Sequence, residues 1–489
     1  MKSDADLDVG LTTGALRAIL AGPASTAGRV DDLARRLGDA IRVGLILDGE
    51  RLPSEARLAR QLGIASVTLR EVLGVLRSEG LIATRRGHNG GTVVTAPSDK
   101  AWALAQRLDR LTMLELRDLG DQRLAILCGS AELAAARAIP ADVDRLRAHV
   151  ARLSAGRDAS ELRRADSLFT VEVAVAAQSP RLAQEDLRLR AEVGDLWWID
   201  ASDAEREFAV RVRSDMVDSI AAGDATAARR HARVIVDHDT RRLADRRARS
   251  ARSTRSDATG AATAETRLAS EFEAIFASLT DLAAGFEVMA QAGLGEGTLR
   301  RRDMAELRPA IERVLEKHSD SLVGAGVVVE PGLLSDVERW LEWLWRAGDG
   351  RPEVLRINLD PRAPDFYDYA VTDWFLQPRQ SGHTAVAGPY VDAACTGQYT
   401  VTLSMPVTAG GRFVGVVAAD APVSVLERIL TGAPDSPSGR PWVVVTSDQR
   451  VLVSSDSAHL PGELLRTEPV ETDVIRFDHP SDMATNPDR

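Results

Sequence analysis

The stretch from Leu52 to Val94 constrains the fold of this chain more than any other part, because signals for helices, a turn and a hairpin follow one another there in a definite order. A first helix is predicted from Pro53 to Gly63, where the glycine breaks it. A second, with apolar residues at helical spacing, is predicted from Ser66 to Gly80. The apolar segments 81–84 and 92–95 then flank a glycine-rich tip, which predicts a two-stranded hairpin.

Helix, tight turn, helix and hairpin in this order predict a winged helix-turn-helix, whose second helix lies in the major groove of DNA. Residues 26–96 contain eleven arginines against eight acidic residues, a local charge of +3, whereas the whole chain carries −11. The overall negative charge argues against nonspecific coating of nucleic acid. A basic island in an acidic chain favours sequence-specific binding of double-stranded DNA through one face.

The length of 489 residues suggests about three domains. We predict a winged helix-turn-helix domain over 26–97, an all-α domain over 100–244, a linker over 245–264 and a third domain over 265–475. The helical domain is rich in Ala, Leu, Arg and Glu. The linker prediction rests on the absence of apolar periodicity in DRRARSARSTRSDATGAATA.

The third domain opens with a predicted long helix, in which seven apolar residues from Leu268 to Met289 alternate at spacings of four and three. Short β-type segments joined by glycine-rich turns follow, and they predict one curved antiparallel sheet with a helix behind it. These segments are 326–330, 354–359, 399–407, 412–420 and 442–447. The predicted fold class is therefore multidomain α+β, with a winged helix-turn-helix, an all-α bundle and an α/β domain with an antiparallel sheet.

Several functional classes lack their signals in this sequence. Only two cysteines occur, so we expect no disulfide framework and a reducing, cytoplasmic location. There is no run of about 18 apolar residues and no signal peptide, so we expect no membrane partner. We find no phosphate-binding loop, nucleophile–base pair or lysine in a cofactor-like setting, and we predict neither enzyme activity nor a cofactor.

The winged region resembles the GntR family of bacterial repressors. The matching motifs are LPSE at 52–55, LARQLG at 58–63, LREVL at 69–73, SEGLI at 78–82 and GHNGGTVV at 87–94. The resemblance implies that Arg70 contacts a base or phosphate. The candidate DNA-binding residues are Arg57, Ser66, Thr68, Arg70, Arg85, Arg86, His88 and Asn89. The alternative for Arg70 is a helix cap or a salt bridge to Glu71 or Glu79.

The recognition helix departs from the family pattern at its start. This chain has Ala65-Ser66 where relatives usually show Ser-Arg, so we expect an unusual operator or a lower affinity for it.

The helical domain resembles the FCD effector domain of FadR-like GntR regulators, whose hallmark is a metal site. Asp166 matches one metal ligand, but Thr170, Arg213 and Ile235 stand where that pattern has histidines. Transition-metal sites need three or four ligands with imidazole donors. We therefore predict no metal, and a domain that dimerises and transmits a signal. His231 and His238 lie outside the ligand register.

The third domain resembles a Cache domain, a PAS-like sensor of small molecules. The resemblance rests on PDFYDYAVTDWFLQP at 364–378, GPYVDAACTGQYTVTLSMPV at 388–407 and RFVGVVAADAPVSVLERIL at 412–430. It implies a pocket with aromatic walls and an acid at the polar end of the ligand. The candidate ligand-binding residues are Tyr367, Tyr369, Asp373, Trp374, Phe375, Tyr390, Asp392 and Asp420. The alternative is core packing for Trp374 and Phe375 and a helix cap for Asp373.

Three carboxylates and few arginines near this pocket favour an amine, an amino acid or another cation as effector. The sequence is thus interpreted as a homodimeric regulator that binds a palindromic operator and senses a small molecule in its Cache domain. Two alternatives remain open at this point. One is a regulator that senses a carboxylate or another metabolite in the FCD bundle and uses the Cache domain for assembly. The other is an enzyme fused to a DNA-binding domain.

Overall fold

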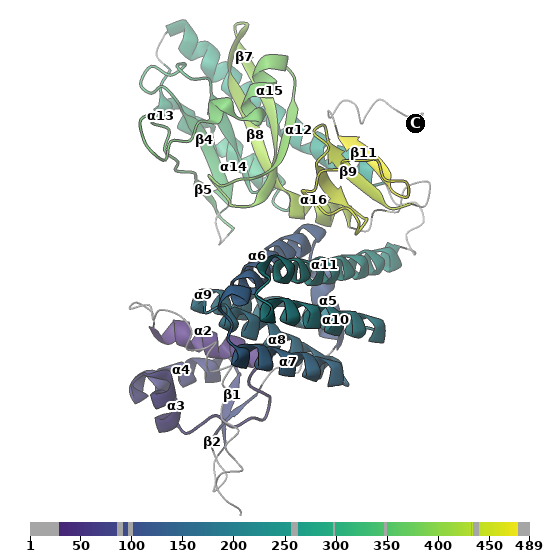
Figure 1. Ribbon diagram of the computed structural model, residues 1–489. Coiled ribbons are helices and arrows are strands. Elements are labelled where there is room, and N and C mark those ends of the chain that lie inside the picture. Colours follow the sequence, from purple (N-terminus) through teal and green to yellow (C-terminus); the bar gives the residue numbers. More distant parts are fainter. Residues whose placement is uncertain are drawn as a thin grey trace, which may run out of the picture. The chain divides into compact units, whose positions relative to one another are not determined.

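A computed structural model describes residues 29–85, 91–95, 101–255, 263–296, 299–346, 350–431, 433 and 440–477. The chain divides into two compact units. The first contains residues 1–111 and 116–244, and the second contains residues 112–115 and 245–489. Figure 1 shows mainly helices in the first unit and sheets together with helices in the second.

The first unit opens with the predicted winged helix-turn-helix. Its elements are α2 (Arg29–Arg42), α3 (Glu55–Leu62), α4 (Ser66–Ser78), β1 (Ile82–Arg85) and β2 (Gly91–Val94). Gly63 ends α3 in a left-handed conformation at φ 63°, which glycine adopts at little cost and which permits the tight turn before α4. The strands β1 and β2 pair antiparallel, as predicted.

A bundle of long helices forms the rest of the first unit. It comprises α5 (Ala101–Arg110), α6 (Met113–Arg137), α7 (Pro140–Ala155), α8 (Ala159–Ala176), α9 (Pro180–Val193), α10 (Asp203–Ala221) and α11 (Ala225–Arg255). The first three residues of α6 and the part of α11 from Asp245 on belong to the second unit. The winged helix shares an apolar core with this bundle, because Leu168, Val171 and Leu187 pack in the same cluster as the buried leucines of α2 and α4.

The boundary predicted at 244–245 does not interrupt the helical structure. Residues 245–255, which we expected to be linker, form the last turns of α11. Ala244, Ala248 and Ala251 are buried there, at helical spacing. A stripe of alanines carries little apolar periodicity, although alanine is the best helix former. The predicted linker therefore keeps only its later residues, most of which lie outside the described ones.

The second unit is built on a six-stranded antiparallel sheet in the order β5-β4-β3-β8-β7-β6. The strands are β3 (Gly324–Val329), β4 (Leu341–Arg346), β5 (Pro352–Val354), β6 (Ala385–Val391), β7 (Tyr399–Ala409) and β8 (Arg412–Pro422). The predicted long helix is α12 (Ala264–Glu296), whose apolar stripe packs in one core with α14 (Arg308–Lys317) and the sheet. Two further helices are α15 (Asp373–Ser381) and α16 (Val423–Leu430).

Two predicted features of the sheet are wrong. Segment 442–447 does not join the six-stranded sheet, because β9 (Trp442–Thr446) pairs with β10 (Val451–Ser454) and β11 (Asp473–Phe477) in a separate sheet. Segment 354–359 is a strand only up to Val354. Beyond it, Leu355 and Ile357 pack as loop residues against an aromatic core, so burial and not strand pairing explains their apolar character.

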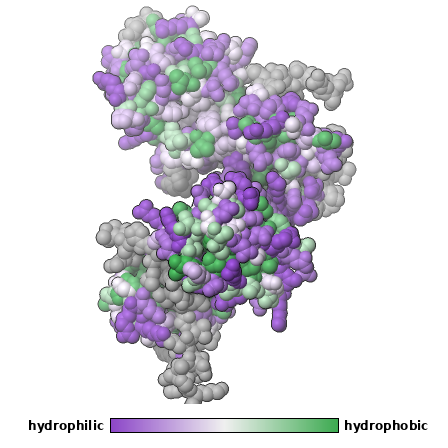
Figure 2. Space-filling model, in the orientation of Figure 1, coloured by the Kyte–Doolittle hydropathy of each residue, from purple (hydrophilic) through white to green (hydrophobic). Residues whose placement is uncertain are grey.

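Within the described residues, no helix is long and apolar enough to cross a membrane. Figure 2 shows hydrophilic residues over much of the visible face, with apolar residues among them in small groups. Such scattered apolar residues are ordinary for protein surfaces.

Candidate DNA-reading surface, bundle core and cavities

Helix α4 presents one face to the core and the opposite face to the exterior. Its buried side chains are Leu69, Val72, Leu73 and Leu76. They fix the rotation of the helix about its axis, because they can be buried together in only one orientation. The exposed side chains near its start are Ser66, Val67, Arg70 and Glu71, whereas Thr68 is half-buried. Val67, which is not among the predicted DNA contacts, is an apolar side chain that is 65% exposed on this face.

Arg70 is held by an acid that the sequence did not point to. Its Nε donates to Oε2 of Glu55, the first residue of α3, at 3.0 Å. Both side chains are exposed, at 66% and 43%, so the pair contributes about 0.2–1 kcal/mol. The guanidinium is thus oriented on the exposed side of α4 by a weak contact.

Only some of the other residues predicted to contact DNA lie in the described part of the chain. Arg57 is exposed on α3. Arg85 ends β1, but its side chain lies outside the described part of the chain, as do Arg86, His88 and Asn89 at the hairpin tip.

Replacing Glu55 by alanine is expected to tighten binding to promoter DNA by about two- to fivefold, because the pair with Arg70 no longer has to be broken. Fluorescence anisotropy with a duplex from the promoter of the chain's own operon measures the affinity. Glu132→Ala is the matched control, because it removes an equally exposed pair, to Arg229, in the helical bundle. Unchanged or weaker binding of Glu55→Ala would show that the pair does not restrain Arg70.

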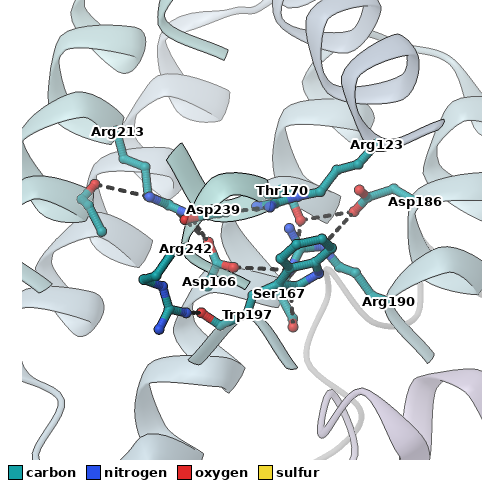
Figure 3. Close-up of polar contacts among 11 residues, drawn as sticks. Arg123, Asp166, Ser167, Thr170, Asp186, Arg190, Trp197, Arg213, Asp239 and Arg242 are labelled. Carbon is teal, nitrogen blue, oxygen red and sulfur yellow. Dashed lines mark hydrogen bonds and ion pairs between the residues drawn. The ribbon is translucent and has the colours of Figure 1, made fainter. Parts of the chain in front are cut away.

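The core of the helical bundle contains a network of ion pairs centred on Asp166 (Figure 3). Its Oδ1 accepts from Nε and Nη2 of Arg213 at 2.9 and 2.6 Å, and its Oδ2 accepts from Nη1 of Arg190 at 3.1 Å. All three side chains are almost completely buried. Burial alone would raise the pKa of Asp166, but Arg213 and Arg190 hold it well below its usual value.

Two more acids extend the network. Asp186 accepts from Arg190 at 3.2 Å and from the hydroxyl of Thr170 at 2.9 Å. Asp239 accepts from Arg123 at 2.7 Å. The charges therefore alternate between arginines and aspartates across α6, α8, α9, α10 and α11.

The residues at this place do not fit a metal ion. The guanidinium of Arg213 contacts the very carboxylate that would hold the metal, and Ile235 is buried in the apolar core. His238 packs edge-on against Phe208, with ring centres 4.1 Å apart. Over the described ranges, no three His, Cys, Asp or Glu side chains are grouped to hold a metal. Arginines of the ion-pair network occupy the polar core of the bundle instead.

The second unit contains a small cavity of about 30 Å³ against the six-stranded sheet. Its polar lining comes from Tyr367, Tyr390, Asp392, Thr402 and Asp420. Trp343 and Trp374 contribute aromatic walls. We call this space the inner cavity. It brings together five of the eight residues predicted to bind a ligand.

Asp420 is the buried acid of the inner cavity. It lies near the end of β8, is 6% exposed, and its Oδ1 accepts from the hydroxyl of Thr402 at 2.6 Å. The hydroxyls of Thr402 and Tyr390 share a short hydrogen bond. Because Thr402 gives its one proton to Asp420, Tyr390 must donate to Thr402. Burial raises the pKa of Asp420 to about 7, and the nearby carboxylate of Asp392 adds to the shift.

Gly324 on β3 leaves room for two of these groups to approach each other. A Cβ placed on Gly324 would lie 2.7 Å from Nε1 of Trp343 and 3.4 Å from Oδ2 of Asp420. The indole N–H of Trp343 is buried and has no hydrogen-bond partner within the part of the chain described. Our prediction missed Trp343, Thr402 and Gly324. The only available signal was the cluster of tryptophans that contains Trp343.

A larger groove of about 1460 Å³ adjoins the inner cavity, and we call it the outer groove. Tyr367, Trp374, Tyr390 and Asp392 line both spaces. Asp373, predicted as a pocket residue, lines only the outer groove. Thr446 at the end of β9 and Arg450 directly before β10 also line it. Both sheets of the second unit therefore contribute to the groove.

Tyr369 and Phe375, which were predicted as pocket residues, line neither of these spaces. The hydroxyl of Tyr369 donates to the carbonyl of Val329 at 2.7 Å and accepts from the backbone N–H of Trp340 at 3.3 Å. Phe375 is fully buried against the rings of Tyr369 and Phe413. Successive residues on a helix point in different directions, so Trp374 reaches the cavity while Phe375 packs into the core.

A winged helix with an exposed reading face, joined to a sensor-like domain with an acid-lined cavity, defines a DNA-binding transcription regulator. The family model described as "Bacterial regulatory proteins, gntR family" matches residues 29–94. The FCD domain matches residues 118–238, and "Methyl-accepting chemotaxis protein-like, first PDC sensor domain" matches residues 308–428. The chain belongs to the GntR family, with an FCD domain and a C-terminal PDC sensor-like domain, which confirms the predicted fold class and family.

Two relatives support this membership. The "Putative HTH-type transcriptional regulator RmpR" of Mycobacterium gastri is 36% identical over 217 residues, which span 44% of this chain and 79% of that protein. The "Putative L-lactate dehydrogenase operon regulatory protein" of Escherichia coli (strain K12) is 32% identical and spans 46% of this chain and 93% of that protein. These relatives are transcription regulators, and none of the matching families is one of enzymes.

One similar solved structure is "Methyl-accepting Chemotaxis protein X". The match covers 39% of this chain and 72% of that chain, at 19% identity and a TM-score of 0.29.

Proposed function

We propose that the chain is a homodimeric regulator that binds a palindromic operator through α4 and the wing. Its affinity for DNA responds to a small cationic ligand, which lies in the outer groove and directs its cationic group toward the inner cavity. The observation that carries the ligand part is the convergence of Asp420, Tyr390, Tyr367 and Trp374 on one small space that adjoins the outer groove. An acid at the end of an aromatic-walled cavity favours an ammonium group, through charge-assisted hydrogen bonding and cation–π attraction.

The proposed operator follows from the geometry of helix-turn-helix dimers. Two copies of α4 read half-sites about one helical turn apart, so a dimer favours a palindrome. The exposed face of α4 presents Ser66, Val67 and Arg70 to base edges. The wing, which is the hairpin of β1 and β2, adds contacts to the DNA backbone.

Replacing Arg70 by alanine is expected to weaken binding to the promoter duplex about 10- to 100-fold, because a base contact by arginine is worth about 1–3 kcal/mol. The affinity is measured by anisotropy at fixed salt. Arg230→Ala, an exposed arginine of α11, is the control of equal charge change. If Arg70→Ala binds as tightly as the control, α4 does not read the operator.

A thermal-shift screen of the full chain against amines, amino acids and organic acids tests the ligand part. We expect amines or amino acids to raise the melting temperature (Tm) of the wild type but not of an Asp420→Asn variant. If the active compounds are organic acids, or if they act equally on the variant, the inner cavity is not the sensing site. A response lost instead in bundle variants would favour sensing in the FCD domain.

The affinity for a cationic ligand is expected to depend on pH through Asp420. Because its pKa is raised to about 7, the acid is largely protonated at pH 6 and ionised at pH 8. A cation binds the ionised form, so its affinity should rise about tenfold per pH unit below pH 7 and level off above it. Isothermal titration calorimetry between pH 5.5 and 8.5 measures this profile. A flat profile would mean that Asp420 does not pair with the ligand.

A further inference from the structure

A second buried carboxylate lies seven residues beyond Asp420. Glu427 is on α16, which begins directly after β8, and it is 6% exposed. The apolar face of this short helix, with Val423, Leu426 and Leu430, is buried in the core of the second unit. The position of the Glu427 side chain is therefore tied to the end of the strand that carries Asp420.

Both oxygens of Glu427 accept hydrogen bonds from the first turn of α6. The backbone N–H of Met113 donates to Oε1 in a short contact, and that of Leu114 donates to Oε2 at 3.2 Å. These two residues belong to the second unit, like Glu427, and Leu114 packs in its apolar core. The first N–H groups of a helix have no partner within the helix, and a carboxylate there also interacts favourably with the helix dipole.

The remaining donors of this turn are satisfied locally. The hydroxyl of Thr112 accepts from the N–H of Glu115 at 3.1 Å, and the carboxylate of Glu115 accepts from the N–H of Thr112 at 2.7 Å. This capping box leaves the N–H groups of Met113 and Leu114 to Glu427, which comes from a segment more than 300 residues away in sequence. A helix start that needs only local capping residues does not require such a distant acid.

Helix α6 continues without a break into the bundle of the first unit. Its later residues Leu127, Cys128, Ala131 and Ala134 belong to the apolar core of the bundle. Arg123, in the middle of the helix, pairs with Asp239 of the ion network. The first turn of α6 therefore contacts Glu427, and the later turns of the same helix pack in the apolar core of the bundle.

We propose that the contact between Glu427 and the first turn of α6 transmits the state of the inner cavity to the DNA-binding unit. This inference rests on the proposed function, because it supplies the path between the two sites. A ligand that moves the end of β8 also moves α16. The hydrogen bonds that Glu427 accepts from the first turn of α6 are then strengthened or broken. Allosteric coupling requires such an element, which both sites bias and which takes more than one arrangement.

The test uses the reciprocity of coupling, so it does not need the effector: promoter DNA must in turn affect the second unit. Hydrogen exchange is measured by mass spectrometry on the full chain with and without the promoter duplex. The variants are Glu427→Ala, the conservative Glu427→Gln, and the control Arg428→Gln, which alters an exposed neighbour on α16. Without DNA, we expect the amides of residues 113–114 to exchange at least tenfold faster in Glu427→Ala than in the wild type or the control.

With DNA, we expect exchange in residues 415–430 to change at least threefold in the wild type and in Arg428→Gln. In both Glu427 variants this response should be lost, while the duplex binds within about twofold of the wild-type affinity. The inference is overturned if the response persists in the variants, if the wild type shows none, or if residues 113–114 exchange equally in all proteins. Failure of the proposed function appears elsewhere, as absence of duplex binding or of any ligand in the thermal-shift screen.

Discussion

Replacing Asp420 by asparagine is expected to abolish high-affinity binding of the cationic effector while making the free protein more stable at pH 8. Removing one partner of a buried charge pair costs about 2–5 kcal/mol, so the ligand affinity should fall at least 30-fold. Asparagine keeps an oxygen that accepts from Thr402, so the hydrogen bond seen in the free protein is retained. The loss therefore reports on charge and not on packing.

The gain in stability follows from the raised pKa of Asp420. In the unfolded chain an aspartate ionises near 3.8, whereas in the folded protein it ionises near 7. Its contribution to stability is fully present below pH 3.8 and is lost as the pH rises through 7. Three pKa units correspond to at most about 4 kcal/mol. Asparagine escapes this loss, so it should raise Tm most at pH 8 and by less than half as much at pH 5.

Differential scanning fluorimetry at the two pH values, together with calorimetry on the effector, measures both effects. Asp360→Asn is the control, because Asp360 is an exposed aspartate of the same unit that pairs with Arg362. If Asp420→Asn lowers Tm at pH 8, the acid serves the fold and not a ligand.

Replacing Arg213 by alanine is expected to destabilise the helical bundle by about 3–5 kcal/mol, because it leaves the buried carboxylate of Asp166 with a single arginine. For a domain of this size, the loss lowers Tm by roughly 10 °C. Arg147→Ala is the matched control, since its pair with Asp218 is exposed at 56% and 66% and should matter little.

Thermal unfolding of the two variants, followed by circular dichroism at 222 nm, measures this difference. Equal Tm values for Arg213→Ala and Arg147→Ala would refute the view that arginines hold the polar core of the bundle.

The sequence was sufficient to predict elements with a strong local signal. Gly63 and the apolar spacing of α4 were enough for the helix-turn-helix, and the heptads from Leu268 to Met289 were enough for α12. The helical structure of residues 245–255 was not predicted, because buried alanines are not distinguishable from exposed ones by composition. Strand β9 was recognised, but whether it pairs with β8 or with β10 is a long-range property.

The site could be predicted where one residue type has few explanations. An acid at the end of an apolar strand is costly without a purpose, and Asp420 does line the inner cavity. Thr402 and Gly324 carry no such signal, because their role arises from pairing between β3, β8 and β7. The partner of Arg70 was unpredictable for the same reason, since Glu55 lies on a different helix.

The most direct test of the central claim is the affinity of the full chain for its promoter duplex, titrated with a compound found in the thermal-shift screen. We expect the dissociation constant to change at least fivefold at saturating compound in the wild type, and to stay constant in Asp420→Asn, which still binds DNA. A compound that binds the wild type through Asp420 and leaves the affinity for DNA unchanged would contradict the account.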